Sequence, residues 1–138
     1  MDERPQFDAK YQVGVEQIDR EHRQLFEIVA RVYDSLEARD DKAQSLIRAA
    51  AAELLDYTAT HFASEEGLMA QAGYPDLAAH REQHEHLLTR ARDMEMRVEL
   101  DDSYVPVELS QFITRWLVEH IEAADHRFGE FVASSKAG

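Results

Sequence analysis

Histidine is the residue type that offers the most chemistry in this 138-residue chain, which has seven histidines and no cysteine. A single imidazole in a helical core is common, because a backbone carbonyl or a tyrosine can satisfy it. Burying five in one small core costs much desolvation free energy unless they share a partner, and a metal ion is such a partner. Five of the seven replace the leucine expected in an apolar helical pattern: His22, His61, His80, His84 and His120.

The spacing of these candidate ligands fits metal binding. His61 and Glu65 are four residues apart, as are His80 and His84, so the two members of each pair lie on one face of a helix. One such pair is a weak signal, because acidic helices contain it often by chance. Two pairs, together with His22 and His120, indicate a metal centre to which every helix contributes.

Asp125 is a further candidate whose position the spacing leaves open. It follows His120 by five residues, which places it about 140° away on an ideal helix. A one-residue π-bulge would bring the carboxylate to the same face, and such bulges are typical of functional sites. The alternative is an ordinary solvated acid. His86 and His126 fall off the apolar faces, and we expect neither to bind metal.

The elements that must hold these residues are helices, because long stretches contain neither glycine nor proline. Apolar residues recur in alternating steps of three and four, the pattern of helices packed in a bundle. We expect an all-α, up-down-up-down four-helix bundle with an irregular N-terminal arm. The chain is short enough to form one domain, 1–138, with the arm at 1–16 and helices near 17–38, 41–70, 76–100 and 105–134.

Composition excludes several classes of partner. Fifteen Lys and Arg stand against 28 Asp and Glu, for a formal net charge of −13, which disfavours nucleic acid and anionic membrane surfaces. The sequence has neither an apolar run of the roughly 18–20 residues that span a membrane nor a secretory leader. We therefore expect a cytoplasmic protein, and the acidic surface favours a monomer.

Several short motifs occur in a specific order: Val13-Gly14-Val15, Ile18-Asp19-Arg20-Glu21-His22, His61-Phe62, Glu65-Glu66, Leu68-Met69, Gly73-Tyr74-Pro75, His80, His84, Trp116-Leu117, His120-Ile121 and Asp125. This ordered set resembles the bacterial hemerythrins, a family of non-haem di-iron proteins that bind oxygen. The resemblance covers nearly the whole chain and matches at all seven ligand positions. It departs in the arm, where the family often has a tryptophan near the position of Phe7.

The resemblance implies a cofactor of two iron ions joined by an oxo or hydroxo bridge. One iron would be held by His80, His84 and His120, and the other by His22 and His61. Glu65 and Asp125 would bridge both, which also answers the question left open for Asp125. The iron with two histidines would keep one open position, beside a pocket formed by Trp116, Leu117 and Ile121. For Phe26 and Phe62, further candidates for the pocket wall, we expect ordinary core packing.

The function that this resemblance implies is reversible binding of dioxygen for transport, storage or delivery, by a binding protein and not an enzyme. Imidazoles outnumber carboxylates in the ligand set, which favours reversible binding over oxidation of a substrate. Two alternatives remain. One is a di-iron nitric oxide or peroxide reductase, and the other is an oxygen or redox sensor that acts through a partner. An oxygen-consuming or redox protein is a further candidate partner.

Overall fold

The computed structural model describes residues 7–36, 43–100 and 105–137, and these residues form helices and no strand. Four long helices make the body of the molecule, a short 3-10 turn precedes them, and a π-helical turn and a last helix follow. Their bounds are η1 Ala9–Tyr11, α1 Glu16–Leu36, α2 Ala43–Ala72, α3 Leu77–Leu100, α4 Val105–His120, η2 Ile121–Asp125 and α5 His126–Ala137. None of the described helices is both long and apolar enough to cross a membrane.

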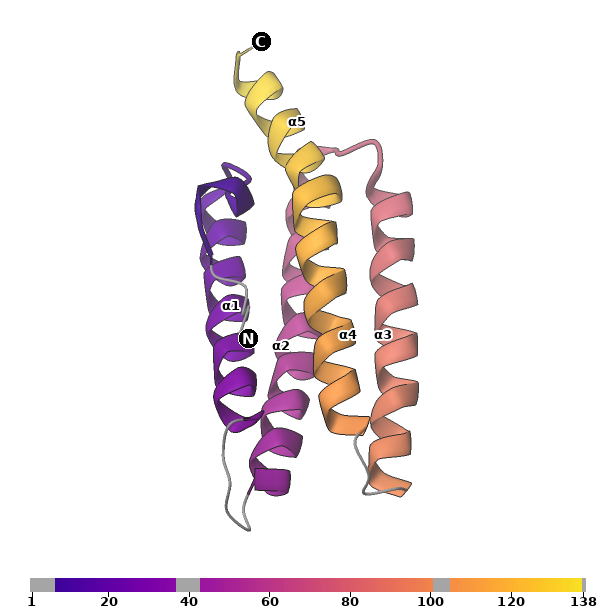
Figure 1. Ribbon diagram of the computed structural model, residues 1–138. Helices are drawn as coiled ribbons and strands as arrows, with labels where there is room; N and C mark the ends of the chain where they lie inside the picture. The colour runs from indigo at the N-terminus through magenta and orange to yellow at the C-terminus, as the bar shows by residue number, and fades with distance from the viewer. Residues whose placement is uncertain (1–6, 37–42, 101–104, 138) are drawn as a thin grey trace.

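The four long helices run alternately up and down and pack side by side, and α5 continues the line of α4 beyond the bundle (Figure 1). The expected four-helix bundle is therefore confirmed. The expected fourth helix, 105–134, is one rod interrupted by the π-helical turn η2. The boundary expected between the first two helices, at residues 38–41, lies outside the described residues.

The turn between α2 and α3 shows how the sequence ends a helix next to the core. Gly73 has a φ of 68°, the left-handed conformation that glycine adopts without strain. The Tyr74 N–H then donates to the Met69 carbonyl oxygen at 3.0 Å. The turn thereby buries the Tyr74 ring against Phe128 of α5, with ring centroids 5.0 Å apart.

The core consists of three apolar clusters that leave a polar layer between them. The largest fills the bundle with residues such as Leu54, Leu87 and Ile113, all at most 1% exposed. A second, around Met69 and Phe128, closes the end from which α5 leaves. The third joins the arm to the bundle through Tyr11. The buried polar side chains described below lie within this apolar frame.

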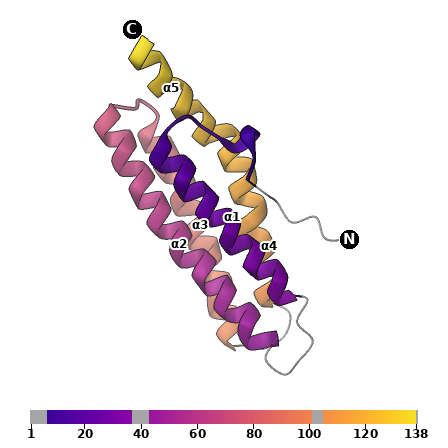
Figure 2. The same ribbon diagram turned by 90° about the vertical axis from the view of Figure 1, so that its left-hand side faces the viewer.

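The N-terminal arm is fixed to the bundle at two points. Asp19 accepts hydrogen bonds from the backbone N–H groups of Val13 (2.7 Å) and Gly14 (3.2 Å). The Tyr11 ring stacks on Phe26 of α1, with centroids 5.0 Å apart. Figure 2 shows the arm crossing outside the bundle beside α1 and α4. The arm therefore covers the two helices that carry His22 and His120.

Candidate metal centre

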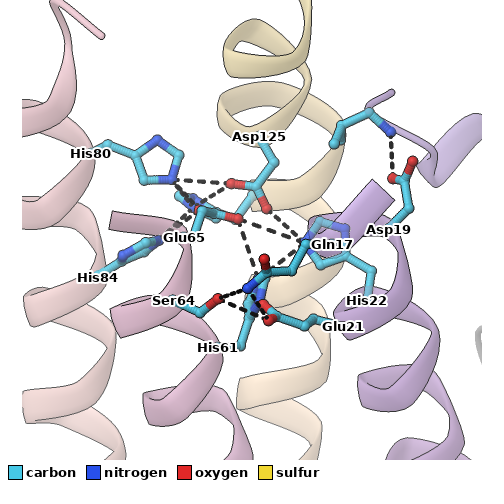
Figure 3. Close-up of polar contacts among 12 residues, drawn as sticks. Gln17, Asp19, Glu21, His22, His61, Ser64, Glu65, His80, His84 and Asp125 are labelled. Atoms are coloured by element: carbon cyan, nitrogen blue, oxygen red, sulfur yellow. Dashed lines mark hydrogen bonds and ion pairs between the residues drawn. The ribbon is translucent and has the colours of Figure 1, made fainter. Parts of the chain in front are cut away.

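The seven candidate ligands meet in one buried layer across the bundle. Figure 3 labels all of them except His120. Each of the five histidines is at most 6% exposed, and Glu65 and Asp125 are at most 1% exposed. The Nε2 atoms of the histidines point toward the two carboxylates, and the potential ligand atoms fall into two groups. All seven residues that the sequence singled out as candidate ligands are thus brought together.

The first group contains three histidines, two from α3 and one from α4. His84 Nε2 lies 3.1 Å from His120 Nε2, which lies 3.0 Å from His80 Nε2. One oxygen of each carboxylate belongs to this group. Glu65 Oε1 lies 2.7 Å from His80 Nε2, and Asp125 Oδ1 lies 3.0 Å from the same atom. Three imidazoles and two carboxylate oxygens therefore surround one point.

The second group contains two histidines, one from α1 and one from α2. The Nε2 atoms of His22 and His61 lie 3.1 Å apart. The other oxygen of each carboxylate belongs to this group, since Glu65 Oε2 lies 3.3 Å from His61 Nε2 and Asp125 Oδ2 lies 3.0 Å from His22 Nε2. Each carboxylate thus offers one oxygen to each group, which is the arrangement that two bridged metal ions require.

Asp125 reaches this layer because of the π-helical turn η2, Ile121–Asp125. The wider turn brings a residue five positions after His120 back to the same face, and Asp125 Oδ1 lies 3.2 Å from His120 Nε2. The hypothesis of a bulge is confirmed. The alternative, a solvated surface acid, is wrong because the side chain is 1% exposed.

Two further carboxylates, which spacing along the chain did not indicate, lie outside the histidines. His61 Nδ1 donates to Glu21 Oε1 at 2.7 Å, and His84 Nδ1 donates to Glu66 Oε2 at 2.7 Å. These hydrogen bonds orient the two rings and leave each Nε2 lone pair directed inward. Each glutamate adjoins a candidate ligand and belongs to a motif of the resemblance, but the contacts themselves cross between helices and were not indicated by the sequence.

The charges of the layer stabilise one another. Burial alone would lower the pKa of His61, but the hydrogen bond with Glu21 and the nearby Glu65 carboxylate outweigh it and raise this pKa to about 10. Burial and the neighbouring Asp125 charge would raise the pKa of Glu65, but the close imidazoles of His61, His80 and His84 lower it to about 2. Burial likewise opposes ionisation of Asp125, while the charge of His120 and close imidazoles hold its pKa well below the ordinary range. Both carboxylates are therefore anionic at neutral pH.

The donor set fits a pair of metal ions. Glu65 Oε2 and both oxygens of Asp125 are buried without a hydrogen-bond partner, although imidazole nitrogens lie near them. Buried carboxylate oxygens in that state call for a cation. Imidazole nitrogen and carboxylate oxygen together suit iron and related transition metals.

The three residues expected to line an oxygen pocket lie on two sides of the rod formed by α4 and η2. Leu117 and Ile121 line a small apolar cavity of about 10 Å³ against α1, which Phe26 also borders. The Trp116 ring instead stacks on His120, with centroids 4.3 Å apart, and borders a groove toward α3. Phe62 stacks on His84 at 3.7 Å, so its packing orients a candidate ligand.

The two remaining histidines lie outside the layer. His86 is exposed on α3, and the side chain of His126 is 44% exposed and lies 3.9 Å from Glu130. Neither belongs to a group of potential ligands among the described residues. These two residues are suitable controls for any experiment on the site.

The fold and the donor set together are those of a helical-bundle protein that binds a pair of metal ions. Comparison with known proteins gives the family. Residues 13–132 match the model of the hemerythrin HHE cation-binding domain, and the chain belongs to the hemerythrin family. The cofactor of this family is a di-iron centre, as the sequence led us to expect.

Individual relatives agree with this assignment. A bacteriohemerythrin of Stenotrophomonas maltophilia is 32% identical over 120 residues, which cover 87% of this chain and 76% of the relative. One of Clostridium acetobutylicum is 31% identical over 127 residues, covering 86% of this chain and 94% of the relative. The crystal structure of a wild-type hemerythrin superposes with a TM-score of 0.80 at 28% identity, covering 91% of this chain and 95% of that one.

Proposed function

We propose that the chain binds dioxygen reversibly at a di-iron centre held by His22, His61, Glu65, His80, His84, His120 and Asp125. The observation that carries the proposal is the unequal division of ligands between the two groups. Both groups share the carboxylates, but one has three imidazoles and the other has two. The metal beside His22 and His61 therefore has one protein ligand fewer, and an open position at a metal is where a small molecule binds.

The bound iron ions would supply the electrons that dioxygen accepts on binding and returns on release. The protein's own part is to hold the ligands and to keep water out. Five neutral imidazoles and only two carboxylates give the centre little negative charge, which disfavours the high-valent iron needed to oxidise a substrate. This ligand balance supports a carrier over an enzyme.

The cavity against α1 supports the same function. It is lined by apolar side chains with Thr114, and lies one helical turn from two candidate ligands, because Leu25 follows His22 by three residues and Leu117 precedes His120 by three. A free volume of about 10 Å³ is close to the smallest that holds one water-sized molecule. An apolar space of this size suits a diatomic gas better than a polar substrate.

Oxygen cycling of the iron-loaded protein tests the proposal. The protein is reduced without oxygen, exposed to it, and then placed under vacuum, while the visible spectrum and the free oxygen are measured. A carrier takes up one dioxygen per di-iron centre, changes colour and recovers its first spectrum. Sustained consumption of nitric oxide or peroxide with a reductant would instead identify a reductase. Irreversible conversion to one oxidised spectrum would favour a sensor.

A further inference from the structure

Glu21 has a position that ligand binding alone does not explain. It lies on α1, outside the metal layer, and its side chain is 16% exposed. Its Oε1 accepts a hydrogen bond from His61 Nδ1, and its Oε2 accepts from Ser64 Oγ (2.8 Å) and Gln17 Nε2 (3.2 Å). Gln17 Nε2 also donates to Ser64 Oγ at 2.8 Å, so the three side chains form one connected network (Figure 3).

Glu21 pairs with no permanent cation in the described residues, because its charged partner is His61, whose ring becomes neutral when it binds a metal. Ser64 and Gln17 are neutral, and in the described part of the chain no lysine or arginine pairs with Glu21. Both oxygens of the Glu21 carboxylate accept hydrogen bonds from side-chain donors, which stabilises the charged form. Glu21 is therefore an anion whose nearest ionisable partner is His61.

The corresponding carboxylate on the other side is different. Glu66 accepts from His84 Nδ1, but it also pairs with Arg81, whose Nε lies 3.1 Å from Glu66 Oε1. Arg81 thus offsets part of the Glu66 charge, although its side chain is 49% exposed and solvent screens the pair. The two sides of the centre consequently have unequal electrostatic surroundings.

His22, the other histidine of this group, increases the contrast between the two sides. His22 Nδ1 is buried without a hydrogen-bond partner, so Glu21 makes the one outer hydrogen bond to a histidine of this group in the described residues. A carboxylate that accepts from Nδ1 fixes the tautomer and makes Nε2 more basic. Its negative charge also stabilises a metal ion more strongly as the charge of that ion increases.

We propose that Glu21 is a positioning residue that fixes His61 for metal binding and, through its unoffset charge, makes the His22–His61 metal the stronger reductant of the two. This inference rests on the proposed function only in placing the open position at that metal. The ion that meets dioxygen would then be the one that gives up an electron more readily. Glu66, offset by Arg81, would orient His84 with a smaller electrostatic effect.

An anaerobic redox titration of the iron-loaded protein tests this inference. Glu21→Gln keeps the size and a hydrogen-bond acceptor but removes the charge, so we expect the iron that it binds to have a higher midpoint potential. Glu27→Gln makes the same charge change at an exposed position of α1 and should leave the potential at the wild-type value. Equal potentials in both variants and the wild type, or equal shifts in both variants, would overturn the inference.

Arg81→Gln provides a second test at an exposed side chain, where folding is not at risk. Removing this cation leaves Glu66 without its offset, so the midpoint potential should fall, opposite to the effect of Glu21→Gln. A potential that rises or stays unchanged would contradict the role of Arg81. If Glu21→Gln loses iron while its helical circular dichroism is unchanged, the loss supports the positioning role.

Nitrogen-15 NMR of the zinc-loaded protein gives a readout that involves neither iron nor oxygen. The Nδ1 proton of His61 should be slow to exchange in the wild type and should shift strongly in Glu21→Gln, but not in Glu27→Gln. An unchanged His61 signal would overturn the positioning role. Because both measurements exclude oxygen, failure of reversible oxygen binding would leave this inference standing, and its own failure would leave oxygen binding untouched.

Discussion

The histidines and carboxylates of the buried layer stabilise one another, because each carboxylate lies beside imidazoles that can offset its charge. Five imidazoles could be predicted as a site because their positions replace leucine in a regular helical pattern. Glu65 followed from its spacing to His61. Asp125 required the resemblance, because the spacing from His120 is wrong for an ideal helix. Glu21 and Glu66 could not be predicted, because a contact between helices depends on how the helices pack.

Substitution of single ligands separates the proposed site from the other histidines. We expect His61→Ala and Glu65→Ala to hold fewer than two iron ions per chain, because the first removes a ligand from the two-histidine group and the second a ligand from both groups. His86→Ala and His126→Ala should keep the wild-type iron content. Iron analysis of the four purified variants checks this, and equal losses in all four would disprove the ligand assignment.

The metal-free protein should have a distinctive pH dependence of stability. The pKa of His61 is raised to about 10 and that of His80 to about 9, from an ordinary 6.5, because the neighbouring carboxylates outweigh burial. Their protonated forms stabilise the fold fully below pH 6.5 and lose this contribution as the pH rises through 9 to 10. Glu65, with its pKa lowered from 4.5 to about 2, loses its contribution as the pH falls below 4.5.

We therefore expect the free energy of unfolding of the metal-free protein to fall as the pH rises from 6.5 toward 10, where His61 and His80 lose their protons. It should also fall at acid pH, where Glu65 is protonated and where His120, whose pKa burial lowers, is forced to charge. Urea unfolding across the pH range measures it. The iron-loaded protein should not share the alkaline loss, because iron binds the deprotonated imidazoles and displaces their protons. A metal-free protein whose stability rises between pH 7 and 9 would contradict the electrostatics described for the layer.

At the scale of elements, the regular helices were predictable and their interruptions only partly so. Stretches without glycine or proline predicted the helices, because nothing in them breaks the hydrogen-bonding pattern. The π-helical turn η2 was anticipated only as one of two readings of the position of Asp125. The path of the arm was not predictable, since it depends on hydrogen bonds from the backbone N–H groups of Val13 and Gly14 to Asp19 of α1.

The arm makes a close contact that a single methyl group should break. Gly129 of α5 lies against Val13, and a Cβ at this position would overlap the Val13 carbonyl oxygen and come within 2.8 Å of its carbonyl carbon. We expect Gly129→Ala to lower the free energy of unfolding by about 1–3 kcal/mol, as overpacking does. Urea unfolding of the two proteins measures the difference.

Gly67 of α2 is the matched control, because a Cβ there would have no neighbour within 4 Å. Gly67→Ala should raise the free energy of unfolding by about 0.5–1 kcal/mol, since alanine restricts the unfolded chain and favours the helix. An effect of the same sign in both variants would show that helix propensity, and not contact with the arm, decides the outcome at Gly129.

At the scale of the whole molecule, the bundle places a polar layer between apolar clusters and gives each of its four helices a share in the ligands. This division explains why the site and the fold should depend on each other, because metal binding joins helices that are far apart in the sequence. The monomeric state and the cytoplasmic location remain predictions. The cavity beside Leu117 and Ile121 could be predicted only in part, because its size depends on side-chain packing across two helices.

The most direct test of the central claim is an anomalous-difference map at the iron edge, from crystals of the iron-loaded protein. We predict two peaks in the buried layer. One should be bordered by His80, His84 and His120, the other by His22 and His61, with Glu65 and Asp125 between them. A single peak, or iron bound at His86 or His126 in place of this layer, would contradict the account.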